Sequence, residues 1–531
     1  MANTNNDQTK LSLERLREIR LEKVKKLREL GIDPYPAKAY RTHMNQEIKD
    51  NFEKLEGKEV SVVGRLMSLR KHGKLIFGNL QDDSGTIQLF IRFDTLEPTD
   101  VKKQTLGWEH IDLIDVGDFL EAYGEVVKTK TGEISVLVKR LKIITKSIRP
   151  LPDKWHGIKD PEVRLRRRYL DMTINPKIRE RFKRRSLFWR AVRDFLNQRG
   201  FWEINIPVLE HVPGGGDARP FVTYYNALDQ HFYLRISHEL ALKRLLGAGF
   251  EKVYDIGPRF RNEGFSPEHL PEHIAMEWYW AYADHRDGMK LTQELFLYIV
   301  KQVYGKTKFK IRGFDIDFSK KWEILDFSKI LKDRFNIDIF ETPVDKMIKI
   351  LKKYNREVEG KNRARVVDSL WKLVRKDIQG PAFLVGVPKF LSPLAKPDPS
   401  NPKVVLRFQP IIAGSELANA WAELNDPVDQ LERFVEQAKL REQGDEEAQF
   451  LDIDFVEMLE WGMPPAVGYG MTERVFWFLE DVPAREGVPF PALRYDIDES
   501  TRRIYKDILP YIQMAHKEIE KKAKNKRISN K

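Results

Sequence analysis

Residues 59–147 alternate apolar and polar side chains in several short runs separated by turn residues. The first runs are VSVVGRLMSLR, KLIFGNLQD and TIQLFIRFD, with the turn DDSG before the third. Two later runs, DFLEAYGEVVKT and ISVLVKRLKIIT, flank the turn KTGE. A period of two places alternate side chains on opposite faces of a strand. About five such strands in a segment of this length indicate a small all-β barrel.

A barrel of this size fits the OB-fold, whose exposed face binds oligonucleotides. Four residues of these segments can supply ring stacking and base-edge hydrogen bonds, namely Arg70, Phe77, Gln88 and Glu133. The alternative is that Phe77 belongs to the core and the polar residues are ordinary surface. The barrel segment by itself favours this alternative.

Composition narrows the class of protein. The 531 residues are 41% hydrophobic and 32% charged, which is typical of a folded, soluble chain with several domains. The absence of cysteine excludes disulfides, zinc sites built on cysteine and cysteine nucleophiles. No apolar run approaches the roughly 18 residues of a membrane span, and the N-terminus lacks an apolar signal region. We therefore expect a cytoplasmic protein that does not enter a membrane.

The net charge of +12 is compatible with a polyanionic partner, and equally with charge that only keeps the protein soluble. The patterning predicts five parts. They are a basic helical arm (1–58), the barrel (59–147), a linker that is proline-rich and then basic (148–177), a domain of helices and strands (178–499, with a helix-rich insertion at about 310–380) and a basic helical tail (500–531).

Residues 253–284, VYDIGPRFRNEGFSPEHLPEHIAMEWYWAYAD, read as a strand, a loop and an alternating aromatic strand. Arg261 offers a permanently charged planar fork that suits a phosphate. Glu263 can accept a hydrogen bond from an amino group, and His269 and His273 add ring nitrogens and a stacking face. The alternative is a surface hairpin with ordinary ion pairs.

The segment SELANAWAELNDPVDQ (415–430) carries carboxylates between apolar neighbours. Glu416, Asn419 and Glu423 share one face if it is a helix, whereas Asn419, Trp421 and Glu423 share one face if it is a strand. Carboxylates in such surroundings must reach water or meet a positive partner.

Several segments, taken together and in order, resemble the class II aminoacyl-tRNA synthetases. The three signature motifs of that family resemble FLNQRGFWEINIPVL (195–209, predicted as a helix followed by one strand), the hairpin at 253–284, and GYGMTERVFWFLE (468–480). A resemblance to bacterial-type lysyl-tRNA synthetases is carried by PGGGDARPFVTYYNALDQHFYLRISHELALKRLL (213–246), FLSPLAK (390–396) and SELANAWAELNDPVDQLERF (415–434). It extends from about residue 10 to about residue 495 and leaves out the basic tail.

The resemblance implies an α+β protein. An N-terminal OB-fold barrel that binds the anticodon precedes a catalytic domain with an antiparallel sheet and flanking helices. It also implies a lysine–tRNA ligase that uses ATP and Mg²⁺, forms lysyl-adenylate and transfers lysine to the 3′-terminal ribose of tRNA(Lys). The first signature motif, with Pro207, would lie at a homodimer interface.

The resemblance also implies a role for particular residues. Glu423 would bind the ε-ammonium of lysine and Glu239 the α-ammonium, with the rest of the lysine pocket formed by Glu277, Tyr279, Asn419 and Trp421. The expected nucleotide contacts are Arg261 at the α-phosphate and the lysine carboxylate, Glu263 at the adenine amino group, His273 and Arg474 on either side of the base, His269 near the phosphates and Glu416 at Mg²⁺. Arg261 and Arg474 are the expected catalytic residues. In the barrel, Arg70, Phe77, Gln88 and Glu133 match positions that read a U-rich anticodon, which reverses the interpretation of Phe77 as core.

Three positions depart from the family pattern. Gln409 stands where a second metal-binding glutamate is usual, and the glycine-rich motif is one residue shorter, with Thr472 near its third glycine. Glu268 stands where an arginine that reaches the ATP phosphates is usual, and the nearby His273 replaces a stacking phenylalanine. Glu268 would repel a triphosphate unless a base such as Arg259 compensates. Two other functions stay open: a lysine ligase that modifies a protein, whose family members lack the barrel, and an RNA-binding protein that retains a synthetase fold without its chemistry.

Overall fold

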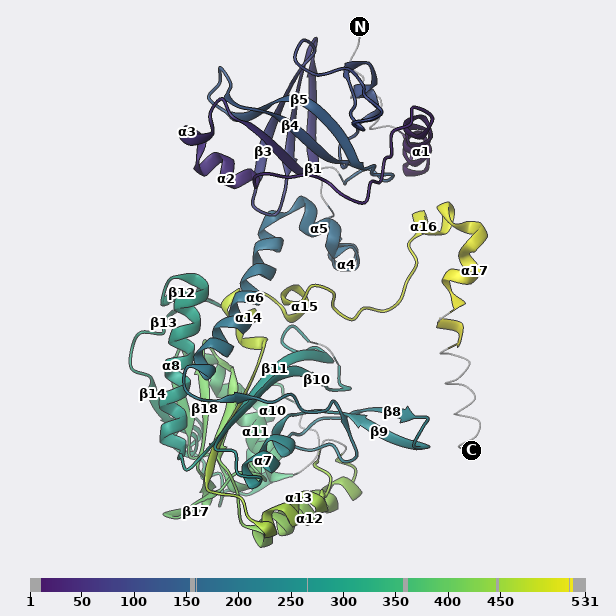
Figure 1. Ribbon diagram of the computed structural model, residues 1–531. Helices are drawn as coiled ribbons and strands as arrows, with labels where there is room; N and C mark the ends of the chain where they lie inside the picture. The colour runs from purple at the N-terminus through teal and green to yellow at the C-terminus, as the bar shows by residue number, and fades with distance from the viewer. Residues whose placement is uncertain are drawn as a thin grey trace. The chain divides into compact units, whose positions relative to one another are not determined.

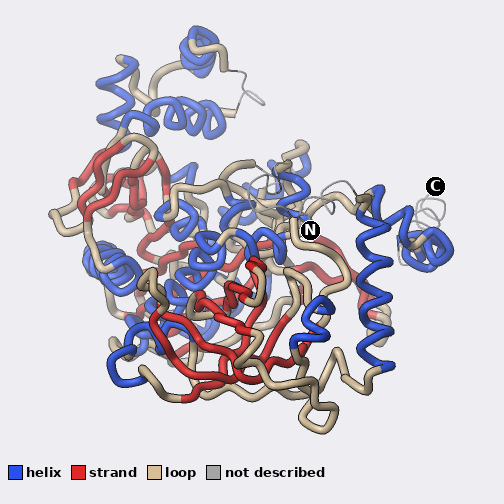
Figure 2. Tube along the Cα trace, turned by 90° about the horizontal axis from the view of Figure 1, so that it is seen from above, coloured by secondary structure: helices blue, strands red, loops and turns tan. Residues whose placement is uncertain are grey.

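The computed structural model describes residues 11–152, 158, 160–264, 266–356, 362–445, 448–514 and 516–518 (Figure 1). The chain forms two compact units, Met1–Gly157 with Arg494–Lys531, and Ile158–Leu493. Both units mix helices and strands (Figure 2). No helix in the described ranges is long and apolar enough to cross a membrane.

The first unit contains a closed barrel with the strand order β1-β2-β3-β5-β4. Neighbouring strands are antiparallel, except that β3 and β5 are parallel. Every second residue of β2 and β3 is buried, so the alternation of the sequence becomes an apolar interior. The predicted OB-type barrel is confirmed. Its strands are β1 (Glu59–His72), β2 (Leu75–Gln81), β3 (Thr86–Arg92), β4 (Phe119–Lys128) and β5 (Ile134–Thr145).

Short helices accompany the barrel. The first one begins where the Ser12 hydroxyl accepts a hydrogen bond from the backbone N–H of Arg15, and it packs Leu27 into the barrel core. Arg503, near the other end of the chain, donates to Glu14 at 2.7 Å. The end of the predicted tail, residues 519–531, lies outside the described residues. The helices of this unit are α1 (Leu13–Glu29), α2 (Asn45–Asp50), α3 (Phe52–Leu55), α16 (Glu499–Ile504) and α17 (Leu509–Ile512).

The second unit is built on a nine-stranded sheet with the order β14-β15-β18-β20-β21-β11-β10-β6, in which β19 pairs with β18. The central strands from β18 to β10 are antiparallel neighbours, which confirms the α+β class. These strands are β6 (Trp202–Glu203), β10 (Lys252–Phe260), β11 (Glu272–Ala281), β14 (Glu323–Asp326), β15 (Ala382–Val385), β18 (Arg407–Ile412), β19 (Ser415–Glu416), β20 (Ala418–Ala422) and β21 (Ala466–Thr472). Smaller sheets contain β7 (Leu209–Glu210), β8 (Phe221–Tyr225), β9 (Gln230–Leu234), β12 (Lys308–Ile311), β13 (Phe314–Asp317), β16 (Pro397–Asp398) and β17 (Asn401–Val405).

Helices cover the large sheet and enclose three apolar clusters. One cluster packs α6, α8 and α14 on the sheet, a second contains α9, α10 and α11, and a third contains α7, α12 and α13. The helices are α4 (Pro161–Arg166), α5 (Arg168–Ile174), α6 (Pro176–Asn197), α7 (Glu239–Gly247), α8 (His285–Tyr304), α9 (Phe327–Phe335), α10 (Val344–Lys353), α11 (Arg363–Val374), α12 (Pro427–Glu442), α13 (Ile453–Trp461), α14 (Arg474–Leu479) and α15 (Ala484–Gly487).

Alternate residues of β11 face opposite sides of the sheet, one side packing into the apolar core and the other lining a cavity. Met276 and Trp278 point into the cluster beneath α8, where the Trp278 and Tyr469 rings stack with centroids 5.3 Å apart. Glu277 and Tyr279 therefore face the opposite side of the sheet, where they line a cavity. The period of two that builds the core thus also places the polar residues.

The structure corrects one predicted strand and resolves one segment that the sequence left open between helix and strand. The strand predicted for FWEINIPVL is wrong as a single element, because only Trp202–Glu203 and Leu209–Glu210 pair, with exposed Pro207 between them. The ambiguous segment at 415–423 forms β19 and β20, since β20 pairs with both β18 and β21. The boundaries of the five predicted parts remain predictions; the segment 148–177 holds α4, α5 and the start of α6.

Candidate active site

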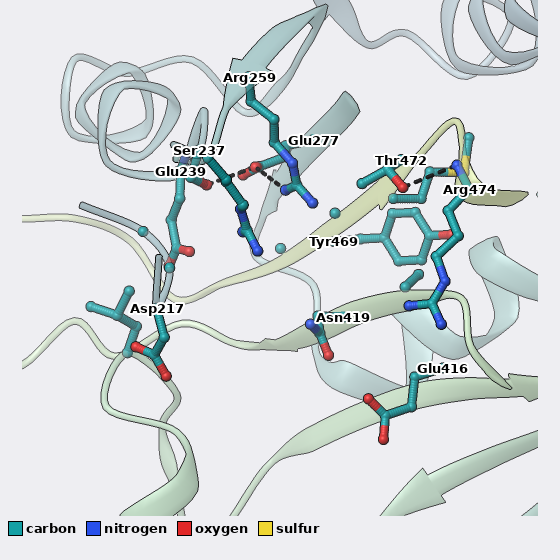
Figure 3. A pocket seen from close by; sticks show the side chains of 18 of the residues that line it. Asp217, Ser237, Glu239, Arg259, Glu277, Glu416, Asn419, Tyr469, Thr472 and Arg474 are labelled. Carbon is teal, nitrogen blue, oxygen red and sulfur yellow. Dashed lines mark hydrogen bonds and ion pairs between the residues drawn. The ribbon is translucent and has the colours of Figure 1, made fainter. Parts of the chain in front are cut away.

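A cavity of about 330 Å³ opens on the polar face of the large sheet. Strands β10, β11, β20 and β21, the first residue of α7 and the loop between β10 and β11 contribute its walls (Figure 3). Twelve side chains singled out from the sequence line it: Glu239, Arg261, Glu263, Glu268, His269, His273, Glu277, Tyr279, Glu416, Asn419, Trp421 and Glu423. Arg259, Thr472 and Arg474 line it as well.

Two of its carboxylates share a cation that the sequence analysis missed. The Lys243 ammonium lies 2.5 Å from Glu239 Oε1 and also pairs with Glu423 Oε2. All three side chains are buried. The i,i+4 spacing of the acid and the base in ELALK, on one helix face, was the available signal.

Burial shapes the ionisation of this triad. It raises the pKa of Glu239 to about 8 and the pKa of Glu423 to about 7, because one ammonium does not fully compensate two buried carboxylates. Burial alone would lower the pKa of Lys243, but the two carboxylates outweigh it and raise that pKa. Lys243 therefore stays charged while the acids are readily protonated.

Glu423 has one oxygen engaged and one available. Its Oε2 accepts from the Trp421 indole N–H at 2.9 Å, in addition to Lys243. Its Oε1 is buried and has no hydrogen-bond partner among the described residues. A Cβ at Gly468 would collide with this oxygen and with the Tyr279 ring, so the glycine keeps space open beside them. An unpaired buried carboxylate oxygen beside such a space suits a small cation.

Glu277 is held in its ionised form. Its Oε1 accepts from the Ser237 hydroxyl at 2.7 Å and from the His238 backbone N–H at 3.1 Å, and its Oε2 accepts from the Tyr279 hydroxyl at 3.1 Å. Burial alone would raise the pKa of Glu277, but His238, Arg259 and the Ser237 hydrogen bond lower it to about 2. Glu277 thus keeps a fixed negative charge at the pocket wall.

Arginines also line the cavity, and the Arg259 guanidinium lies 3.8 Å from Glu277 Oε1. Arg259 donates from Nε to His273 Nε2 at 2.8 Å, and His273 Nδ1 lies 3.1 Å from the Leu270 carbonyl. Burial and the neighbouring arginines hold the pKa of His273 well below its usual range, so the ring is neutral. Arg261 lies against Gly216, where a Cβ would stand 3.2 Å from its Nη2. The Arg261 guanidinium can take an anion.

Strand β21 ends at Thr472, and α14 begins at Arg474. The Thr472 hydroxyl accepts from the Arg474 backbone N–H at 3.1 Å, which joins the residue of the shortened motif to the first residue of this helix. The Arg474 side chain extends toward Glu416 (Figure 3) and pairs with Glu268.

The two predicted metal ligands lie on the neighbouring strands β18 and β19, where Glu416 is paired with Ile411, two residues from Gln409. Glu416 lines the cavity and accepts from the Trp371 indole N–H. Gln409 is not a lining residue, and its amide donates to Asn419 Oδ1 at 2.5 Å. In the described part of the chain, no group of three or more carboxylates and imidazoles gathers that could hold a metal ion.

Three of the four predicted barrel residues line one broad hollow on the first unit. Arg70, Phe77 and Gln88 contribute to it. The Phe77 ring is half-buried and stacks on Phe90 with centroids 5.0 Å apart. Glu133 does not line this hollow and instead pairs with Lys49 at 3.7 Å.

An antiparallel sheet whose cavity is lined by both acids and arginines, together with a separate OB barrel, defines a class of enzyme. The chain belongs to the family described as tRNA synthetases class II (D, K and N), which matches residues 160–494. The OB-fold nucleic acid binding domain matches residues 60–144. Members of this synthetase family are ATP-dependent ligases.

Curated relatives sharpen the assignment. The chain is 44% identical over 494 residues to the lysine–tRNA ligase of Thermotoga maritima, covering 91% of this chain and 96% of the relative. It is 45% identical over 492 residues to that of Thermosipho africanus, with the same coverage. For the lysine–tRNA ligase of Fervidobacterium nodosum the identity is 43% over 522 residues, which cover 97% of this chain and all of the relative.

Proposed function

We propose that this protein is a lysine–tRNA ligase, which activates lysine with ATP and transfers it to the 3′-terminal ribose of tRNA(Lys). The observation that carries the proposal is that three buried acids, Glu239, Glu277 and Glu423, line the same cavity as several arginines. The names of the curated relatives support the same reaction.

The buried acids of the cavity recognise the two ammonium groups of lysine. Glu423 receives the ε-ammonium at its unpaired Oε1, and Glu239 receives the α-ammonium. Tyr279, Asn419 and Trp421 shape the slot for the aliphatic stem. A neutral side chain would leave Glu423 Oε1 without a partner, so discrimination can reach roughly 10⁴-fold. Aspartate would instead require a base near Glu423.

Residues of the hairpin formed by β10 and β11, together with Arg474, bind the nucleotide. Arg261 holds the α-phosphate and the lysine carboxylate, Glu263 accepts from the adenine amino group, and the ring of His273 and the guanidinium of Arg474 enclose the base. His269 lies near the phosphates. A carboxylate oxygen of lysine attacks the α-phosphorus in line and pyrophosphate leaves. The tRNA hydroxyl then attacks the lysyl carbonyl and releases AMP. Positioning and fixed positive charge carry the catalysis, so no protein nucleophile is needed.

Mg²⁺ fits this site as an ion carried by ATP. Such ions are commonly held by substrate phosphates, water and one or two carboxylates, and Glu416 can supply one carboxylate. When bound, the ion would offset negative charge on the phosphates. The prediction of Gln409 as a second ligand requires its amide to leave Asn419.

The barrel hollow is proposed to read the anticodon, through Arg70, Phe77 and Gln88, with Glu133 at its margin. A cytoplasmic location follows from the use of tRNA. We also propose a homodimer. Its support is the set of exposed aromatic side chains on the second unit, where Trp202, Tyr282 and Trp461 are 68%, 70% and 92% exposed.

Lysine-dependent ATP–pyrophosphate exchange tests the function. With Mg²⁺ present we expect exchange with lysine and none with aspartate, asparagine or arginine. Exchange with lysine would also show that Gln409, Glu268 and Thr472 are compatible with the chemistry. A folded protein that exchanges with none of the four amino acids would contradict the proposal and favour an RNA-binding role.

A further inference from the structure

A carboxylate occupies the region of the cavity where the proposed function needs positive charge. Glu268 lines the cavity and accepts from two arginines, with Oε2 on Arg474 and Oε1 on Arg312 at 2.6 Å. Burial alone would raise the pKa of Glu268, but Arg474 and Arg312 outweigh it and lower that pKa, so the acid is ionised. Arg474 is thus already paired before any nucleotide is present.

Arg312 belongs to none of the signature segments. It lies in the turn between β12 and β13, outside the motifs that build the cavity. Its guanidinium also donates to the Ser415 hydroxyl at 2.8 Å and lies 5.2 Å from the centroid of the Phe478 ring. These contacts fix the guanidinium beside Glu268.

The two arginines differ in their access to the cavity. Arg474 lines the cavity and its side chain is 19% exposed, whereas Arg312 does not line it and is 38% exposed. Glu268 lies between them and offers one oxygen to each. A carboxylate that gives up Arg474 therefore still has a partner on the side away from the cavity.

We propose that Arg312 is a positioning residue for ATP binding, which retains Glu268 when the nucleotide takes Arg474. In this exchange the nucleotide replaces one carboxylate oxygen at Arg474, and the other carboxylate oxygen stays on Arg312. The inference rests on the proposed function. The exchange explains how Glu268 can stand near the proposed phosphate site, because Arg312 continues to neutralise its charge when ATP is bound.

The test measures the KM for ATP and the KM for lysine in pyrophosphate exchange for Arg312→Gln, Glu268→Gln and the double variant. Arg312→Gln should raise the KM for ATP roughly tenfold, because Glu268 is then left to compete for Arg474 alone, and should leave the KM for lysine unchanged. Glu268→Gln should lower the KM for ATP. The double variant should resemble Glu268→Gln, since Arg312 acts through the carboxylate.

Two further variants separate positioning from folding. Arg312→Lys keeps the charge and should recover most of the ATP affinity, and Lys310→Gln removes an exposed charge from the same hairpin and should change nothing. A double variant that keeps the full defect of Arg312→Gln would overturn the proposal, because Arg312 would then contact the nucleotide directly. So would an unchanged KM for ATP in Arg312→Gln.

The outcome is separable from that of the proposed function. If the wild-type protein shows no exchange at all, the ligase proposal fails. Equilibrium dialysis with ATP alone then gives dissociation constants for the same variants, and the same order of affinities would still support the role of Arg312. Identical affinities across the variants would overturn it.

Discussion

A lysine of the chain itself neutralises part of the pocket that is proposed to bind lysine. Lys243 holds one oxygen of Glu239 and one of Glu423, and leaves Glu423 Oε1 unpaired. Removing one partner of such a buried ionic group commonly costs about 3–5 kcal/mol, since the remaining charges are left uncompensated. Lys243 therefore stabilises the arrangement of the acids as well as their charge.

The raised pKa values of Glu239 and Glu423 predict that lysine binds more weakly as the pH falls. Burial holds the pKa of Glu239 at about 8 and the pKa of Glu423 at about 7, so both acids take up protons as the pH falls through this range. A protonated acid no longer attracts an ammonium. We expect the KM for lysine to rise by up to about tenfold per pH unit as the pH falls from about 8 to about 6.

The control is the KM for ATP, measured over the same range in the same assay. A KM for lysine that stays flat across that range would show that the two acids remain ionised when the pocket is ready to bind.

Glu423→Gln tests the ε-ammonium assignment directly. The amide keeps the size of the side chain and removes its charge. We expect the KM for lysine to rise by roughly 10²-fold or more, while ATP still binds. Lysine activation and ATP dissociation constants measured on the same protein sample check this. Unchanged lysine activation would show that another acid binds the ε-ammonium.

The motif residues of the site could be named from the sequence because the family resemblance places them. The i,i+4 spacing of Lys243 and Glu239 is visible in the sequence, but the contact of Lys243 with Glu423 and the contact of Arg312 with Glu268 are not. Lys243 reaches Glu423 from 180 positions away in the sequence, and Arg312 reaches Glu268 from a different hairpin. Such pairs depend on tertiary packing, which spacing along the chain does not encode.

At the scale of elements, pairing within the sheet decides between helix and strand where the local sequence pattern fits both. The segment ANAWA satisfies a helix or a strand by its spacing, and its pairing with β18 and β21 makes it β20. The barrel was predictable because its alternation is local and strict. The order of the nine strands was not, because β14 pairs with β15 across more than 50 residues.

The barrel's proposed role is testable by one aromatic residue. Phe77→Ala removes a ring that lines the hollow, and stacking of a base on such a ring is worth roughly 1–3 kcal/mol. We expect weaker charging of tRNA(Lys), with lysine-dependent pyrophosphate exchange unchanged. The two assays on one preparation give the comparison. An equal loss in both assays would instead indicate a structural role for the ring beside Phe90.

At the scale of the whole molecule, the net charge of +12 favours a polyanion. The sequence alone left solubility as an equal explanation. If tRNA is bound through phosphate contacts, its affinity should fall steeply as salt rises, because binding releases counterions. We expect tRNA affinity to drop by about 10³-fold or more between 50 and 200 mM salt if several phosphates are neutralised.

Lysine binding should change far less over that range, because its ion pairs lie in a buried pocket that salt screens weakly. Filter binding of tRNA and the KM for lysine, followed together, make the comparison. Parallel losses would argue that the surface charge serves solubility and that salt acts on the fold.

The ammonium of Lys243 also affects the stability of the folded protein when no lysine is bound. A pocket of acids that relied on free lysine for its counter-charge would be least stable whenever the amino acid is scarce. Here the counter-charge is covalently part of helix α7 and is present at every lysine concentration. The integrity of the empty enzyme is thereby separated from the supply of lysine, and a starved cell keeps a folded enzyme ready for the amino acid's return.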